Sequence, residues 1–339
     1  MSRDSRPDVP EAINRLLAGQ TYVTSPEVAA AANVTRQAAH YHLSRLAARG
    51  VLVQQGARRS SRYRLAAQRS TTYPLEGITE DDVWGSERMS LRQIDPELEE
   101  RPNVLRILTF GFTEMVNNAI DHSQGSTLDI RWFIDNERIA FEVEDDGIGA
   151  FASLRESRGL DNDFQGVGEL SKGKQTTAPE RHSGLGIFLT SRLVQRFVLA
   201  ANKYVWTVNN DIDDYAVAEL VHPRRGTLVR CEIPLDTSVD LPAVMSEVSD
   251  PVTHRLNRTT LHVELFREGD FVSRTEAKLI GARLEGFEVV ELDFAGVDQI
   301  GQGFADELFR VWAREHPHIE LLPLHANGAV LAMIDAVRP

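Results

Sequence analysis

The chain has 339 residues, of which 42% are hydrophobic and 26% charged, a composition typical of a soluble folded protein with two or three domains. No apolar run approaches the roughly 18–20 residues that a membrane-spanning helix needs, and the first residues have no signal-peptide core, so we expect a cytoplasmic protein without membrane contact. The single cysteine, Cys231, excludes an internal disulfide, and we expect it in the core of a strand.

The charge is unevenly distributed along the chain. Residues 1–75 hold eleven Arg, no Lys and four acidic residues, a balance of +7 that leaves −20 for the remainder of a chain with a net charge of −13. A basic N-terminal segment on an otherwise acidic chain predicts that nucleic acid binds this segment and no other part of the chain.

The first elements in chain order are three short helices and a basic hairpin. The second helix has a capping hydroxyl in Thr24, an initiating proline in Pro26 and an early acid in Glu27. The predicted helices cover residues 9–18, 25–32 and 35–49, and the predicted strands cover 51–54 and 61–65.

This order of elements resembles a winged helix-turn-helix domain, to which we assign residues 1–70. In that family the third helix enters the major groove of DNA and basic hairpin residues contact phosphate. The same fold also serves as a dimerisation or peptide-binding module, which remains the alternative. The resemblance implies base contacts from Arg36, Gln37 and His40, and backbone contacts from Arg58, Arg59 and Arg62.

After a polar, Pro-containing stretch over about 66–81, a helix is predicted from about Pro102 to His122. Within it Glu114 and Asn118 are four residues apart, which places them on one face of the helix, about one turn apart. An amide oxygen is a suitable Mg²⁺ ligand, and a carboxylate one turn away can take a proton from water. The pair is suited to handling a nucleoside triphosphate.

Two predicted strands follow, over 127–134 and 138–144, and the second runs into Asp145-Asp146-Gly147-Ile148-Gly149. Glycines at such a place let the backbone approach a flat base and phosphates closely. The carboxylate of Asp145 can accept a hydrogen bond from an exocyclic amine.

A Gly- and charge-rich stretch over about 155–183 shows no periodicity, and we expect it to be a functional lid. Lys172 and Lys174 lie in it, either to neutralise a γ-phosphate or as solvated loop charges. The stretch runs into Ser183-Gly184-Leu185-Gly186, where glycines beside a helix N-terminus form an anion site. That helix is expected to end near Phe197.

Further strands over 204–208, 214–221 and 227–234 are predicted to complete an α/β sandwich. Together and in this order, the motifs resemble the GHKL ATP-binding superfamily of gyrase, histidine kinases and anti-sigma serine kinases. The resemblance covers about residues 85–236 of a domain assigned to 82–236. It implies ATP and Mg²⁺ as cofactors.

The resemblance also implies roles for individual residues. Asn118 would be the Mg²⁺ ligand, Asp145 the adenine contact, and Thr227 a neighbour of the adenine end. His182 stands where the family has a glycine on the phosphate side. The residues implied to line the nucleotide are Gly147, Gly149, Gly184, Leu185 and Gly186.

The residue at position 114 separates branches of this superfamily. Sensor histidine kinases usually carry Asn there, whereas gyrase-like ATPases and anti-sigma kinases carry Glu and use it as a general base. Glu114 is therefore implied to be catalytic. The alternative is an ion pair between Glu114 and Arg106 or Arg181.

The last part of the chain alternates strands and helices, after a linker expected over 236–255. We assign 255–339 to a STAS-like domain, because Val289–Val297 and Ile300–Leu308 are similar to the family called DUF4325. Anti-anti-sigma STAS proteins carry a phosphorylatable serine where this chain has Gly301-Gln302-Gly303, without a hydroxyl. The predicted strands are 261–265, 288–293 and 319–324, and the predicted helices are 274–284, 303–315 and 329–337.

The sequence thus predicts a multi-domain α/β protein with a winged helix-turn-helix, a GHKL α/β sandwich of the Bergerat type and a STAS-like domain. The function it favours is a DNA-binding transcriptional regulator that binds Mg-ATP and hydrolyses it slowly. DNA would bind the first domain and a protein partner the last, and a homodimer is compatible with this reading. The alternatives are an anti-sigma-type serine/threonine kinase, a non-catalytic nucleotide sensor and a nucleic-acid-stimulated defence ATPase.

Overall fold

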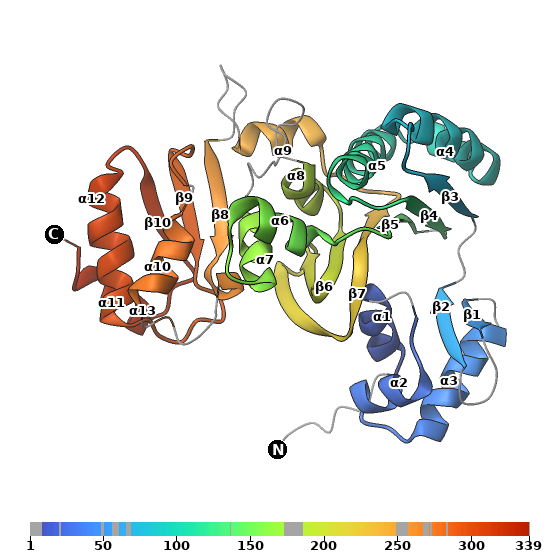
Figure 1. Cartoon of the computed structure of the whole chain (residues 1–339), viewed down its shortest axis with the longest axis horizontal. Coiled ribbons are helices and arrows are strands. Elements are labelled where there is room, and N and C mark those ends of the chain that lie inside the picture. Colours follow the sequence, from blue (N-terminus) through green and yellow to red (C-terminus); the bar gives the residue numbers. More distant parts are fainter. Residues whose placement is uncertain are drawn as a thin grey trace.

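Three units follow one another along the chain in the computed structural model (Figure 1). In this view the N-terminal unit (blue) and the C-terminal unit (orange and red) lie on different sides of the central unit. None of the helices among the described residues is long and apolar enough to cross a membrane. The structure describes residues 9–19, 22–48, 51–55, 61–65, 69–135, 137–172, 186–248, 257–266, 271, 273–282 and 284–338.

The N-terminal unit consists of three helices and an antiparallel hairpin, as the sequence predicts. A capping box starts the second helix, where the Thr24 N–H donates to Glu27 Oε2 at 2.6 Å. The unit has its own hydrophobic core around Val28, Leu43 and Tyr63, so it forms a separate packing unit. Its elements are α1 (Val9–Gly19), α2 (Ser25–Ala31), α3 (Arg36–Ala48), β1 (Leu52–Gln55) and β2 (Arg62–Leu65).

An antiparallel five-stranded sheet, in the order β3-β4-β5-β7-β6, forms the centre of the second unit. Its interior is apolar and includes Cys231, which is buried as expected. Its strands are β3 (Arg69–Pro74), β4 (Thr127–Ile134), β5 (Arg138–Asp145), β6 (Arg196–Asn209) and β7 (Asp214–Pro234).

Strand β3 lies in the polar stretch over 66–81, so the sheet begins before residue 82, the expected start of the domain. The polar side chains of this strand are accommodated because a buried carboxylate from a neighbouring helix accepts their hydrogen bonds. The Arg69 guanidinium pairs with Glu87 at 2.8 Å, and the Tyr73 hydroxyl donates to the same carboxylate at 2.5 Å. Trp132 of β4 adds its indole N–H at 2.8 Å. These hydrogen bonds hold the pKa of Glu87 below its usual value against the burial that would raise it.

Helices pack beside this sheet, with α5 lying on β5 and β7. The stretch 155–183, expected to lack regular structure, contains the end of α6 and all of α7. The Asn162 side chain caps α7 by accepting from the Gln165 N–H at 3.0 Å. Likewise, α9 lies in the expected linker over 236–255. The helices are α4 (Glu80–Ile94), η2 (Pro96–Glu100), α5 (Pro102–His122), α6 (Ala150–Arg158), α7 (Asp163–Ser171), α8 (Gly186–Leu193) and α9 (Leu241–Val248).

Helix α8 ends earlier than predicted, at Leu193, and Phe197 belongs to β6. The Phe197 ring is wholly buried and packs edge-on against Trp206 of the same strand, with 5.5 Å between ring centroids. Phe197 therefore belongs to the strand, where its ring is buried in the core.

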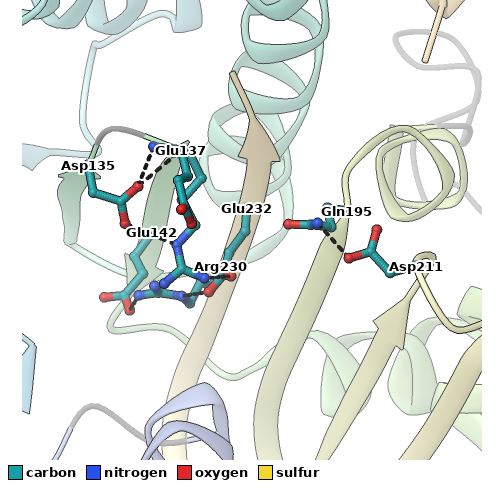
Figure 2. Close-up of polar contacts among 8 residues, drawn as sticks. Asp135, Glu137, Glu142, Gln195, Asp211, Arg230 and Glu232 are labelled. Atoms are coloured by element: carbon teal, nitrogen blue, oxygen red, sulfur yellow. Dashed lines mark hydrogen bonds and ion pairs between the residues drawn. The ribbon is translucent and has the colours of Figure 1, made fainter. Parts of the chain in front are cut away.

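The other face of the sheet carries charged residues paired across its strands (Figure 2). The Arg230 guanidinium lies between the carboxylates of Glu142, at 3.0 Å, and Glu232, at 2.8 Å. Arg131 continues the row to Glu142 at 2.6 Å. All four side chains are buried, so each charge depends on its partners. We call Arg131, Glu142, Arg230 and Glu232 the charge ladder.

The C-terminal unit has a parallel three-stranded sheet in the order β10-β9-β8. Its first strand lies about three residues earlier than predicted, because the residues after His262 turn into a 3₁₀ helix. The other predicted strands and helices are present. The elements are β8 (Arg258–His262), η3 (Val263–Phe266), α10 (Arg274–Gly281), β9 (Val289–Asp293), α11 (Gln302–Ala305), the π-helical η4 (Asp306–Trp312), α12 (Ala313–Glu315), β10 (Glu320–Leu324) and α13 (Gly328–Asp335).

Candidate nucleotide-binding site

The helix that carries Glu114 and Asn118 is fixed by aromatic packing. The ring of Phe112 on α5 stacks on Trp132 of β4, with 5.1 Å between centroids, and meets Phe141 of β5 edge-on at 5.5 Å. These rings are wholly buried, so α5 has a defined position on the sheet. Its last two turns then stand over the carboxyl end of β5.

A cavity opens between the last turns of α5, the helices α6, α7 and α8, and the strands β5, β6 and β7. Apolar side chains make most of its wall, and a few polar groups converge on it, the usual composition of a small-molecule site. Its lining residues are Met115, Asn118, Ala119, His122, Ser123, Val143, Asp145, Ala150, Ser153, Leu154, Leu170, Ile187, Leu199, Thr227 and Val229.

Asp145 ends β5 and brings a carboxylate into this wall. Burial raises the pKa of Asp145 above its usual value, opposed by hydrogen bonds from Gly147 and Thr227. The Gly147 N–H donates to Asp145 Oδ1 at 2.9 Å. A buried carboxylate in an apolar wall is a strong hydrogen-bond acceptor for a ligand donor.

The segment after Asp145 packs directly on the end of α5. The Ile148 N–H donates to the Ser123 carbonyl at 2.8 Å, and a Cβ at Gly147 would collide with that carbonyl oxygen. Glycine is therefore required at position 147 by the close approach of two backbones. Gly149 is the N-cap of α6, and the Thr227 hydroxyl accepts from the Ala150 N–H at 3.0 Å.

Asn118 lines the cavity with an amide nitrogen that is buried and has no hydrogen-bond partner in the described part of the chain. Buried polar atoms are almost always paired, so an orphan atom at a cavity wall indicates a ligand. Because the two ends of an amide are assigned from their surroundings, either the oxygen or the nitrogen can face that ligand.

Glu114 lies one turn before Asn118, beside the first residue of α8. A Cβ at Gly186 would displace the Glu114 carboxylate, so the small residue there lets this side chain lie against α8. Among the described residues that line the cavity, Glu114 is not included, and its carboxylate lies beside Gly186, the first residue of α8. Arg106, one alternative partner, instead pairs with Asp240 at 3.4 Å. Arg181, the other, lies outside the described residues.

The structure does not bring Lys172 to the cavity. Its side chain is wholly buried, and its ammonium donates to Glu169 Oε1 and to the Leu279 carbonyl, both at 2.7 Å. The expected phosphate contact is thus replaced here by contacts with the C-terminal unit. Lys174, Gly184 and Leu185 lie outside the described residues.

Sequence reasoning missed Asn202, whose side chain joins two elements of the site. Its amide donates to the Ile148 carbonyl at 2.8 Å and accepts from the Ala152 N–H at 3.0 Å. It also missed Leu170, which it assigned to an irregular lid. Neither residue stands in a recognisable motif, since their contacts come from distant parts of the chain.

The predicted DNA contacts lie on the N-terminal unit, away from this cavity. Arg36, Gln37 and His40 are all exposed on α3. The Arg62 guanidinium lies over the Tyr22 ring, 4.1 Å from its centroid. Arg58 and Arg59 lie outside the described residues.

Comparison with known families gives two matches. Residues 88–206 match the histidine kinase-like ATPase domain, and residues 274–331 match the STAS-like domain of unknown function (DUF4325). No curated protein matches the chain. The predicted resemblance is confirmed for these two domains, and the chain carries a GHKL-type domain of the ATPase or kinase class. Neither match reaches residues 1–70.

Proposed function

We propose that the protein is an ATP-binding regulator that binds DNA and controls transcription, and whose GHKL-type domain binds Mg-ATP and hydrolyses it slowly. The observation that carries the nucleotide part is the cavity itself. It combines apolar walls, the buried Asp145 carboxylate and the unpartnered amide of Asn118. This donor set fits a purine base with an exocyclic amine, and a metal-bound phosphate chain, better than an apolar ligand.

The donors available for a metal are few, which fits a metal that arrives with its substrate. Among the described residues, no group of three His, Cys, Asp or Glu side chains could hold a metal ion. Mg²⁺ commonly takes only one or two protein ligands and completes its shell with water and phosphate. The Asn118 amide would be the protein ligand, and Mg²⁺ would supply charge neutralisation on the phosphates.

The chain's own residues divide the remaining work. Asp145, fixed by Gly147 and Thr227, accepts a hydrogen bond from the amine of the base. Glu114, one turn before Asn118 on α5, takes the proton of the attacking water. His122 and Ser123 contribute polar groups to the same wall.

DNA binding is supported by the exposed side of α3. Besides Arg36, Gln37 and His40, the exposed residues of this helix include Tyr41 and Arg45, which form one stripe along it. An exposed stripe of basic, amide and aromatic side chains suits base edges and phosphates. The net charge of +7 over residues 1–75 supports the same partner.

Labelled ATP tests the nucleotide part of the proposal, and DNA affinity, measured separately by titration with duplex DNA, tests the DNA part. The full chain is incubated with γ-labelled ATP and Mg²⁺, with and without duplex DNA, and the label is followed to free phosphate or to protein. We expect free phosphate from the wild type and none from Glu114→Gln, with nucleotide still bound by that variant. Wild-type protein that binds no ATP would refute the nucleotide part, and an Arg36→Ala variant with unchanged DNA affinity would count against the DNA part.

The same label distinguishes the second candidate, an anti-sigma-type serine/threonine kinase. The STAS-like match favours it, because STAS domains are the substrates of such kinases in the family resemblance given above. Gly301-Gln302-Gly303 carries no hydroxyl, so the acceptor would be a separate protein. Label transferred to a partner with little free phosphate would establish the kinase.

A further inference from the structure

The end of α7 connects the nucleotide cavity with the C-terminal unit. Leu170 lines the cavity and is 7% exposed, and Lys172, two residues later, is wholly buried. In Figure 1, α7 stands beside β8, the first strand of the C-terminal unit. One short segment therefore has a side chain in each of the two sites.

The C-terminal unit holds Lys172 through both its side chain and its backbone. The ammonium donates to the carbonyls of Leu279, at 2.7 Å, and Ala282, at 3.0 Å, at the end of α10. The Thr259 hydroxyl of β8 donates to the Lys172 carbonyl at 2.9 Å. Within α7, Glu169 completes the shell of the ammonium at 2.7 Å.

These contacts depend on one another because the ammonium is buried. A lysine charge removed from water needs hydrogen-bond acceptors on every side. The last carbonyls of α10 supply two of them, at the end of a helix where a cation is favoured. If the C-terminal unit shifts on α7, Lys172 and Glu169 must rearrange, and Leu170 moves with them.

We propose that Lys172 is a positioning residue through which the C-terminal unit sets the nucleotide affinity of the cavity. The inference rests on the proposed nucleotide site and adds its regulation. Any change that stabilises the contact of α10 and β8 with α7 strengthens nucleotide binding. By linkage, bound nucleotide stabilises that contact by the same free energy. A partner that binds the C-terminal unit thereby changes the nucleotide affinity of the ATP site without contacting that site.

The test uses two neighbouring threonines of β8 in the full chain. Thr259→Val removes the hydroxyl that holds Lys172, whereas Thr260→Val is the matched control, because the Thr260 hydroxyl donates to Glu291 within the C-terminal sheet at 2.8 Å. Affinity for a non-hydrolysable Mg-ATP analogue is measured by titration calorimetry. We expect about fivefold weaker binding for Thr259→Val and an unchanged affinity for Thr260→Val.

A second variant tests the ammonium. Lys172→Met combined with Glu169→Gln removes both buried charges without a large change in volume, and it should weaken the analogue about tenfold. Hydrogen exchange reports the reciprocal effect, because nucleotide should slow exchange of the Ala282 amide, which closes α10 on Lys278, in wild type and less so in Thr259→Val.

The outcomes separate the two ideas. If the wild type does not bind the analogue, the proposed nucleotide function fails, and this inference fails with it. If the wild type binds but Thr259→Val and the double variant bind equally well, or Thr260→Val loses as much, the cavity is a nucleotide site that the C-terminal unit does not tune.

Discussion

The two faces of the five-stranded sheet use carboxylates in opposite ways. On the ladder face, Glu232 is buried beside Arg230, and that cation holds its pKa below the usual value. On the helix-covered face, Asp145 stands in an apolar wall, and burial raises its pKa. A carboxylate ion-paired with a buried guanidinium stabilises the sheet, whereas the Asp145 carboxylate, whose pKa is raised by burial, is available to a ligand.

Breaking the ladder should have the largest effect on stability. Arg230→Met leaves the buried carboxylates of Glu142 and Glu232 without their shared cation, so we expect the free energy of unfolding to fall by about 3–5 kcal/mol. Urea unfolding measures it. A triple variant that also carries Glu142→Gln and Glu232→Gln should recover part of the loss, and no recovery would mean that the packing of Arg230 over Phe133 matters more than its charge.

On the opposite face, removing Asp145 should act on the ligand instead. Asp145→Ala is expected to weaken Mg-ATP binding about 100-fold, because it removes a buried acceptor from a largely apolar wall. Asp146→Ala is the matched control, since that carboxylate accepts from the Ser126 and Thr127 N–H groups, at 2.6 and 2.9 Å, outside the cavity lining. Equal affinity in wild type and Asp145→Ala would contradict the adenine contact.

Ionised carboxylates on the two faces should contribute to the free energy of unfolding with opposite signs, so lowering the pH should affect the two faces differently. Glu144 of β5 lies on the ladder face and pairs with Arg131 at 2.5 Å. Glu232 and Glu144 have lowered pKa values, so the stability they contribute is present above their usual value near 4.5 and is lost as pH falls through the lower folded-state values. Asp145 has a raised pKa, so its ionisation disfavours the fold above its usual value near 3.8. Asp145→Asn should therefore be more stable than wild type at pH 7, and that advantage should vanish below about pH 3.8 in urea titrations.

An exposed ion pair should matter least. Arg106 and Asp240 meet at 3.4 Å, and both side chains are about half exposed. Arg106→Met is expected to change the free energy of unfolding by less than about 1 kcal/mol, because solvent screens the pair. A loss comparable to that of Arg230→Met would show that burial does not separate the two kinds of pair.

The sequence predicted most where chemistry is local. The spacing of Glu114 and Asn118 on a helix, and the glycines after Asp145, follow from backbone geometry over a few residues, and the structure brings Asn118, Asp145 and Thr227 to one cavity. It predicted less where partners are distant. It did not predict strand β3, because Glu87, which satisfies the polar side chains of that strand, comes from a helix. Lys172 resembled a phosphate ligand because α10 lies more than a hundred residues further along the chain.

By itself, therefore, the sequence determined the order of the units, the GHKL-type and STAS-like resemblances and the phrases that surround the cavity, since each depends on periodicity, spacing or local turn chemistry. Only the tertiary structure decided which charges are paired. Whether a buried carboxylate or ammonium is neutralised depends on groups brought to within about 3 Å by folding, and this pairing separates Glu232 from Asp145 and joins Lys172 to the C-terminal unit.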